Sequence, residues 1–300
     1  MTPFCAAIDW GTSSFRLWLL TASGAVLAER WSDEGMVSAA STGFDVVLER
    51  HLSELGVPDE LPVVMCGMVG ARQGWQEAGY LDTPADLGGI IGKARKIIDA
   101  YPRDARILPG VAKRKAGAPD VMRGEETQLL GLVADGVEAG LILMPGTHSK
   151  WVTLKGGRVK GFSTYMTGEQ FGVLSRHSVL CAAVDAAATV APDDPGFLDA
   201  ARTAFGDPQA LSNLLFQLRA GKLLGFARPA NATGHSIMRI SLPPAACAIS
   251  IGRCWNITDW RCAGEAVRRW LCGRRIPSGP RANGRPWPLK REPDQDGFIL

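Results

Sequence analysis

Two short stretches of the sequence place glycine, threonine and serine in the same order, and these residue types together can bind an anion. The stretches are Gly11-Thr12-Ser13-Ser14 and Gly146-Thr147-His148-Ser149-Lys150. Each follows an apolar run typical of a strand, and a second such run comes after it. Glycine lets a phosphate approach the backbone closely, and successive N–H groups and hydroxyls in a tight turn form a concave anion site. The pattern predicts two phosphate-binding hairpins, although Gly-Thr-Ser turns are also common in ordinary hairpins.

An acidic residue stands beside only one of the two hairpins. Asp9 lies just before the first, whereas Met144 and Pro145 occupy the matching place before the second. A carboxylate in that position can hold Mg²⁺ directly or through water. We therefore expect Asp9 to be a metal ligand.

Two further carboxylates, Glu125 and Glu126, follow a glycine where a helix over residues 125–137 is expected to begin. The helix dipole keeps such a carboxylate ionised and ready to accept a proton. Acidic residues in a first helical turn also serve stability alone. The residues by themselves leave both interpretations open.

The hairpins must be positioned by strands, and each is expected to be the first turn of a three-strand meander. The strands after the hairpins are expected at residues 15–20, 25–31, 151–154 and 158–162. An amphipathic helix at residues 43–56 and a buried strand at 63–66 follow the first meander, which predicts the β-β-β-α-β start of a ribonuclease-H-like half. Further elements are expected as helices at residues 90–101, 168–188, 197–205 and 208–224, and as a strand at 105–111.

The composition is that of a soluble globular enzyme. The chain has 300 residues, 46% hydrophobic content and a net charge of +3, which indicate ample core and no nucleic-acid partner. No apolar run is long enough to span a membrane. Seven cysteines without a Cys-x-x-Cys pair favour reduced thiols, and hence a cytoplasmic location.

Four blocks of the sequence, in order, resemble the 2-dehydro-3-deoxygalactonokinase family of the sugar kinase, actin and heat-shock chaperone superfamily. The blocks are Asp9-Trp10-Gly11-Thr12-Ser13-Ser14, residues 67–75 (GMVGARQGW), residues 123–128 (RGEETQ) and residues 145–151 (PGTHSKW). The resemblance covers about residues 4–228. It implies an α/β fold of two ribonuclease-H-like (actin-like ATPase) lobes around a nucleotide cleft, with an N-terminal lobe at 1–137 and the start of a C-terminal lobe at 138–228.

The resemblance also implies an activity: ATP- and Mg²⁺-dependent phosphorylation of 2-dehydro-3-deoxy-D-galactonate at its 6-hydroxyl, in galactonate catabolism. It assigns the catalytic base to Glu125, with Glu126 as the runner-up. The two hairpins would bind the triphosphate, with Lys150 near the transferred phosphate or the substrate. A small sugar acid is the expected partner, without nucleic acid or membrane, and a homodimer is compatible with this interpretation.

A keto-acid substrate carries a carboxylate, which a guanidinium binds best. Arg16, Arg72 and Arg123 each lie beside a glycine-rich block and are the candidates. Gln73 and Trp75 are expected to contact substrate hydroxyls and a sugar face. Each arginine could equally be a structural ion-pair partner.

Two alternatives are a phosphohydrolase of the same fold and a catalytically impaired kinase-like protein. The second arises because residues 229–300 do not match the family, although its adenosine-binding segment is expected there. This tail has 11 basic and 5 acidic residues and many Pro, Trp and Cys residues. We interpret it as an atypical tail translated from a shifted reading frame.

Overall fold

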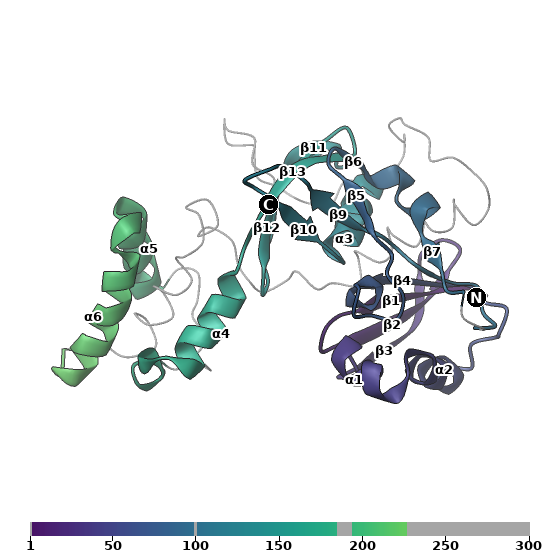
Figure 1. The fold of residues 1–300 in the computed structure, drawn as a ribbon, viewed down its shortest axis with the longest axis horizontal. Helices are drawn as coiled ribbons and strands as arrows, with labels where there is room; N and C mark the ends of the chain where they lie inside the picture. Colours follow the sequence, from purple (N-terminus) through teal and green to yellow (C-terminus); the bar gives the residue numbers. More distant parts are fainter. Residues whose placement is uncertain (1, 99–100, 185–193, 227–300) are drawn as a thin grey trace. The chain divides into compact units, whose positions relative to one another are not determined.

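The computed structural model describes residues 2–98, 101–184 and 194–226 (Figure 1). The expectations for the tail at 229–300 and for residues 185–188 of the 168–188 helix lie outside these residues. Among the described residues, no helix is both long enough and apolar enough to cross a membrane.

The described elements are runs of strands separated by helices, with three helices at the end of the described chain. The strands are β1 (Pro3–Trp10), β2 (Phe15–Thr21), β3 (Val26–Ser32), β4 (Val63–Gly67), β5 (Tyr80–Asp82), β6 (Ala85–Asp86), β7 (Arg95–Lys96), β8 (Ala105–Ile107), β9 (Gly110–Lys113), β10 (Asp120–Met122), β11 (Ala139–Met144), β12 (Ser149–Lys155) and β13 (Arg158–Tyr165). The helices are α1 (Met36–Thr42), α2 (Phe44–Glu54), α3 (Glu125–Ala134), α4 (Thr167–His177), α5 (Pro195–Gly206) and α6 (Leu211–Leu223).

The largest sheet has six strands in the order β3-β2-β1-β4-β8-β7. Strands β1, β2 and β3 form the expected antiparallel meander, and β4 and β8 continue the sheet in parallel with β1. With α2 between β3 and β4, this is the predicted β-β-β-α-β order. The α/β, ribonuclease-H-like class is therefore confirmed.

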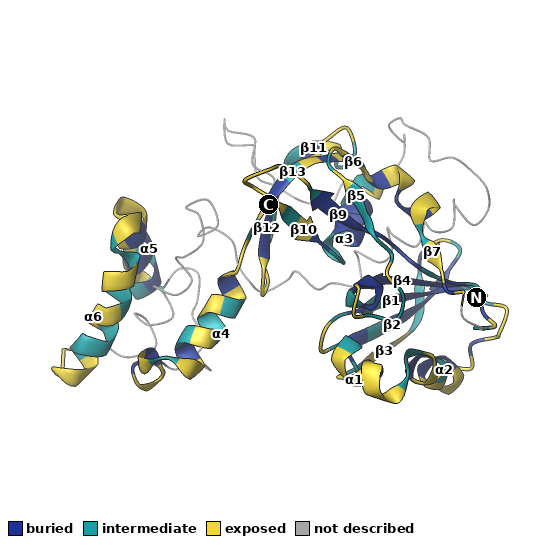
Figure 2. Ribbon diagram, viewed as in Figure 1, coloured by how far each residue is buried: buried dark blue, intermediate teal, exposed yellow. Residues whose placement is uncertain are grey.

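The core of this part of the chain lies around β1 and β4, which Figure 2 shows as mostly buried. Strand β1 reads as a nearly continuous apolar run because, as in other central strands with both faces covered, neither face meets water. Helix α2 buries Val47, Leu48 and Leu52 in the cluster that also contains Ile8 and Met65. These buried contacts hold β1, which carries Asp9 and leads into the first hairpin, and the neighbouring end of β4.

Two smaller sheets complete the described fold: β10-β9-β5 and β11-β12-β13-β6. In the second of these, three successive strands after residue 138 are neighbours, as the second meander required. The chain divides into two compact units, whose described residues are 2–98, 101–141 and 152–162 in one and 142–151, 163–184 and 194–226 in the other. The lobe boundaries expected from the sequence remain a prediction.

Three local expectations are wrong. The helix expected at residues 168–188 ends at His177, where Ser178 is extended. The strand expected at residues 105–111 is divided into β8 and β9, which belong to different sheets. The described part of residues 90–101 is no continuous helix: it contains a 3₁₀ turn at Ile91–Lys93 and the edge strand β7. Ile97 is buried and its N–H bonds to the Ala105 carbonyl at 2.9 Å, so pairing with β8 overrides the helical pattern. Helix α1 was not expected, because its sequence MVSAAST has no apolar periodicity.

Candidate functional site

The carboxyl ends of β1 and β4 bring an acidic and a basic residue together. Asp9 is opposite Arg16 in the β1–β2 register, with 3.7 Å between Asp9 Oδ2 and Arg16 Nη1. Burial raises the pKa of Asp9 to about 6, against the opposing effect of Arg16 and with a further upward contribution from Glu125. A cation beside the partly buried Asp9 carboxylate would therefore favour its ionised form.

Two glycines allow helix α3 to begin close to this carboxylate. Gly67, at the end of β4, has φ +90°, and a Cβ there would lie 2.7 Å from the Trp10 carbonyl oxygen and 3.1 Å from Asp9 Oδ1. Gly124 has φ +109° and would place a Cβ 3.6 Å from Gly67 Cα. Both positions require the left-handed region, which glycine adopts without strain. The start of α3 thus lies beside the end of β4.

The two glutamates at the start of α3 have different environments. Glu126 is fully buried, and its Oε1 and Oε2 accept the Gly124 N–H at 2.9 and 2.7 Å. Burial, followed by the charge of Glu125, raises the pKa of Glu126 to about 8. Glu125 is half-buried and its Oε2 accepts the Arg123 N–H at 3.1 Å. Glu126 therefore caps the helix from inside, and Glu125 is the carboxylate that solvent reaches.

Arg123 is fixed beside the same helix start. Its guanidinium lies 4.3 Å from the centre of the Tyr80 ring, and Nη2 donates to the Gly79 carbonyl at 2.9 Å. Its Nε and Nη1 atoms are buried and have no hydrogen-bond partner in the described part of the chain. Buried donors of this kind are costly unless a partner satisfies them, so Arg123 is suited to bind an acceptor.

The first hairpin presents backbone donors to its surroundings. Thr12 and Ser13 are exposed, and the Gly11 N–H closes the turn on the Ser14 carbonyl at 2.9 Å. Within the described residues, the N–H groups of Thr12 and Ser13 have no acceptor. The anion-binding role expected for this hairpin stays a prediction.

The second hairpin is held by side-chain hydroxyls. Ser149 and Thr167 hydrogen-bond to one another, Ser149 Oγ accepts the Gly146 N–H at 3.3 Å, and Thr167 Oγ1 donates to the Gly146 carbonyl at 3.2 Å. Lys150 is only 4% exposed, and its Nζ donates to the His148 carbonyl at 3.1 Å. Ser149 and Lys150 thus stabilise the turn, while Thr147 and His148 are exposed.

Comparison with known proteins identifies the family. The family model for 2-keto-3-deoxy-galactonokinase matches residues 9–236. The chain belongs to the 2-keto-3-deoxy-galactonokinase family. It is therefore a carbohydrate kinase, as the sequence predicted.

Relatives of this kinase agree with the assignment. A protein described as a 2-dehydro-3-deoxygalactonokinase from Rhizobium meliloti (strain 1021) is 54% identical over 230 residues, which are 76% of this chain and 75% of the relative. The 2-dehydro-3-deoxygalactonokinase of Escherichia coli (strain K12) is 34% identical over 225 residues, 75% of this chain and 73% of that one. A crystal structure of a Sinorhizobium meliloti protein described in the same way has a TM-score of 0.79 and 44% identity, and the match covers 90% of this chain and 99% of that one.

Not every residue predicted for the substrate site of this kinase has an obvious part in it. Arg72 and Gln73 are exposed. Trp75 belongs to an aromatic cluster, with its ring stacked on Phe44 at 6.0 Å and edge-on to Tyr101 at 5.1 Å. Their roles toward a substrate stay predictions, whereas Asp9, Arg16, Arg123, Glu125 and Glu126 gather around the ends of β1 and β4.

Sequence patterns gave no signal for Cys66, which also lies in this kinase site. It pairs with Asp9 in the β1–β4 register and is buried. Burial, together with the charges of Asp9 and Glu126, raises the pKa of its thiol well above the usual value. A neutral thiol here adds no charge to an already acidic site.

Proposed function

We propose that this kinase transfers the γ-phosphoryl group of ATP to the 6-hydroxyl of 2-dehydro-3-deoxy-D-galactonate. The observation that carries this proposal is the position of Glu125 and Asp9, at the carboxyl ends of β1 and β4 and next to the first hairpin. In open α/β sheets, ligands bind at these strand ends. Family membership supports the sugar-acid substrate.

Each Gly-Thr hairpin would bind part of the triphosphate. The backbone N–H groups of four exposed residues are the proposed donors: Thr12, Ser13, Thr147 and His148. Phosphoryl transfer depends mainly on positioning and charge neutralisation, which fixed backbone dipoles supply without reorganisation. The Ser13, Ser14 and Thr12 hydroxyls add donors beside the first hairpin.

Asp9 would hold Mg²⁺. The cation usually keeps several waters and takes one or two carboxylates together with substrate phosphates, so a single, partly buried carboxylate next to a phosphate hairpin fits it. Among the described residues, no group of three or more acidic, histidine or cysteine side chains forms a metal cage. When bound, Mg²⁺ neutralises charge on the phosphates.

Glu125 would act as the general base. The sugar oxygen attacks the γ-phosphorus, the bond from that phosphorus to the β–γ bridging oxygen breaks, and ADP leaves with the bridging oxygen. The hydroxyl proton passes to Glu125. Glu126 is unsuited to this role because it is fully buried and bonded to Gly124.

Arg123 would bind the substrate carboxylate. Its Nε and Nη1 donors are buried without a protein partner in the described residues, and a carboxylate would satisfy a charged donor. Arg16 is held near Asp9 and lies 4.8 Å from the centre of the Trp31 ring, so we assign it to the support of Asp9.

The decisive experiment measures ATP-dependent phosphorylation of 2-dehydro-3-deoxygalactonate by the full chain and by Glu125→Gln. Loss of a general base lowers kcat by roughly 10²- to 10⁴-fold. Glu138→Gln is the matched control, because Glu138 is exposed beyond the far end of α3 and should leave kcat unchanged.

Two results would contradict the proposal. ATP hydrolysis without a phosphorylated sugar acid would indicate the phosphohydrolase alternative, which the family assignment does not favour. Full activity in Glu125→Gln would remove Glu125 from the base role.

A further inference from the structure

The two phosphate hairpins are held by the same backbone arrangement. At the first, the Met36 and Val37 N–H groups donate to the Gly11 and Thr12 carbonyls at 2.8 and 3.2 Å. At the second, the Gly168 and Glu169 N–H groups donate to the Gly146 and Thr147 carbonyls at 3.3 and 3.1 Å. In both cases two successive amides at the start of a helix, α1 or α4, hold the two carbonyls of a Gly-Thr pair.

Peptide geometry gives this arrangement a consequence for phosphate binding. The C=O of one residue and the N–H of the next belong to one planar trans unit and point in opposite directions. Fixing the Gly11 and Thr12 carbonyls therefore fixes the Thr12 and Ser13 N–H groups on the opposite side. The same holds for the N–H groups of Thr147 and His148. These are the four donors proposed to bind the triphosphate.

Each arrangement requires a glycine where helix and hairpin meet. Gly35 is the N-cap of α1, and a Cβ on it would lie 2.5 Å from the Ser13 carbonyl carbon. Gly168, in the first turn of α4, would place a Cβ 2.8 Å from the Gly146 oxygen and 2.9 Å from Thr147 Cα. Any side chain at either position must push the hairpin away, because the neighbouring atoms belong to the backbone.

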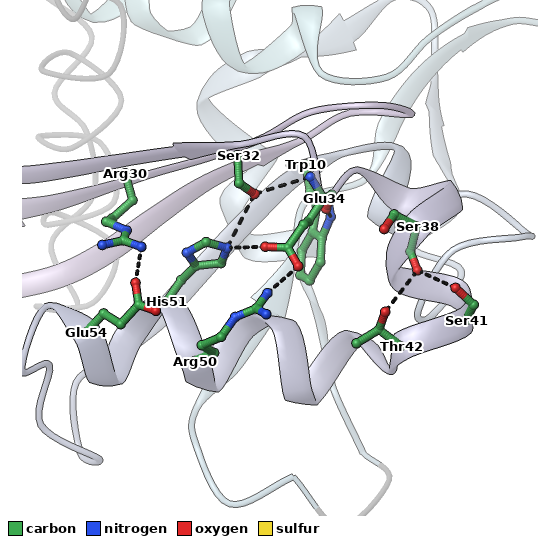
Figure 3. A network of polar contacts seen from close by, with 10 residues as sticks. All are labelled: Trp10, Arg30, Ser32, Glu34, Ser38, Ser41, Thr42, Arg50, His51 and Glu54. Atoms are coloured by element: carbon green, nitrogen blue, oxygen red, sulfur yellow. Dashed lines mark hydrogen bonds and ion pairs between the residues drawn. The ribbon is translucent and has the colours of Figure 1, made fainter.

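The segment that carries Gly35 is itself anchored, as Figure 3 shows. The Glu34 carbonyl accepts the Trp10 Nε1–H at 2.9 Å, and the Glu34 carboxylate pairs with Arg50 and, at 2.9 Å, with His51 Nε2. His51 stacks on Phe15, the residue that follows the hairpin, with 4.5 Å between ring centres. Helix α2 thereby holds the loop against the hairpin.

We propose that Gly35 and Gly168 are positioning residues for ATP: each lets the first amides of a helix clamp the carbonyls of a Gly-Thr hairpin and so aim its free N–H groups at the phosphates. The inference rests on the proposed function, because it takes ATP phosphates as the anion. The sequence patterns did not indicate a role for either glycine, because each lies outside the two hairpin stretches.

The test measures kcat, KM for ATP, KM for the sugar acid and the thermal midpoint of the full chain in the parent and in three pairs of variants and controls. Gly35→Ala is compared with Gly92→Ala, and Gly168→Ala with Gly172→Ala, because a Cβ on Gly92 or Gly172 meets nothing within 4 Å.

Met36→Pro is compared with Met36→Ala. Proline suits the first helical position, and the extended backbone of Gly35 (ψ −179°) suits a residue before proline, so this change removes one clamping N–H without breaking α1. The parent chain is the common reference for all three pairs.

A displacement of about 1 Å can cost roughly 10²-fold in rate, so we expect KM for ATP to rise at least about tenfold in Gly35→Ala, Gly168→Ala and Met36→Pro. KM for the sugar acid and the controls should change by less than about twofold, a split that a general loss of structure would not produce.

Unchanged KM for ATP in variants that keep their thermal midpoint would overturn the inference. Unfolding of all three variants would overturn it too, because the contacts would then serve the fold as a whole. A parent chain that neither binds Mg-ATP in titration calorimetry nor phosphorylates the sugar acid would instead contradict the proposed function itself.

Discussion

The carboxyl groups at the ends of β1 and β4 differ in burial, and burial decides what each can do. Asp9 is 17% exposed as a side chain and faces Arg16, Glu125 is half-buried, and Glu126 is fully buried. A buried carboxyl group resists ionisation. The stability of the protein and its dependence on Mg²⁺ should therefore change with pH, through Glu126 and Asp9 respectively.

The first prediction concerns Glu126 and stability. Its pKa is raised from 4.5 to about 8 on folding, so the folded state keeps a proton that the unfolded state loses. The stabilisation is fully present below about pH 4.5 and is lost as the pH rises toward 8. Glu126→Gln removes this titration, and its thermal midpoint should fall less than that of the parent between pH 5 and pH 8.5. Parallel curves for parent and variant would contradict the burial of an ionisable group here, and Glu138→Gln supplies the exposed control.

The second prediction concerns Asp9 and Mg²⁺. Since the pKa of Asp9 is raised to about 6, protons compete with the metal as the pH falls below that value. The Mg²⁺ concentration for half-maximal activity should rise between pH 7.5 and pH 5.5 in the parent. In Asp9→Asn it should be high at both pH values, with a rate loss of more than about 10²-fold if several kcal/mol of charge stabilisation are lost. A variant with the parent's Mg²⁺ dependence would exclude Asp9 as the ligand.

At the scale of elements, helix α2 is joined to the loops that flank β4 and β8 by a buried arginine. The Arg103 side chain is 3% exposed. It donates from Nε and Nη2 to Glu49 at 2.7 and 3.0 Å, and from Nη2 to Asp59 at 2.8 Å. Tyr101 also donates to Glu49. This network positions the helix that supports the loop carrying Gly35.

We predict that Arg103→Met destabilises the protein by about 2 kcal/mol or more, because hydrogen bonds to charged groups contribute about 1.5–3 kcal/mol. The half-exposed pair of Arg106 and Asp104 is the comparison: Arg106→Met should cost less than about 1 kcal/mol. Urea unfolding of both variants measures the difference. Equal losses would mean that the Arg103 network adds nothing beyond a surface ion pair.

At the scale of the whole molecule, the question is whether the full chain binds nucleotide. A ligand that binds only the folded state stabilises it, by about 2.7 kcal/mol at 100 times its Kd. We expect the thermal midpoint of the full chain to rise with Mg-ATP and to rise less with Mg²⁺ alone. A flat response would favour the impaired-kinase alternative.

The interpretation of residues 229–300 as a shifted reading frame is tested separately. Re-sequencing the gene should reveal an insertion or deletion near the codons that precede residue 229. One continuous, undamaged frame would contradict the interpretation, whatever the nucleotide-binding result.

The sequence by itself determined the elements that are specified by local signals, that is, by residues close together along the chain. The β1–β3 meander, α2, β4 and α3 were predicted near their observed bounds, since periodic apolar residues and glycine turns are local signals. The two Gly-Thr hairpins and the acidic pair at the start of α3 were recognised for the same reason. Family membership followed from the same blocks.

Only the tertiary structure decided the features that depend on partners distant in sequence. Residues 95–96 form a strand because β8 offers an edge, and Glu126 is separated from Glu125 by burial that sequence spacing does not encode. Gly35 and Gly168 acquire their significance from backbone atoms 22 and 21 positions away, at Ser13 and Thr147. A single glycine has no side chain and gives no sequence pattern that predicts such a contact. Its role can be seen only in the tertiary structure, where the helix start and the hairpin lie against one another.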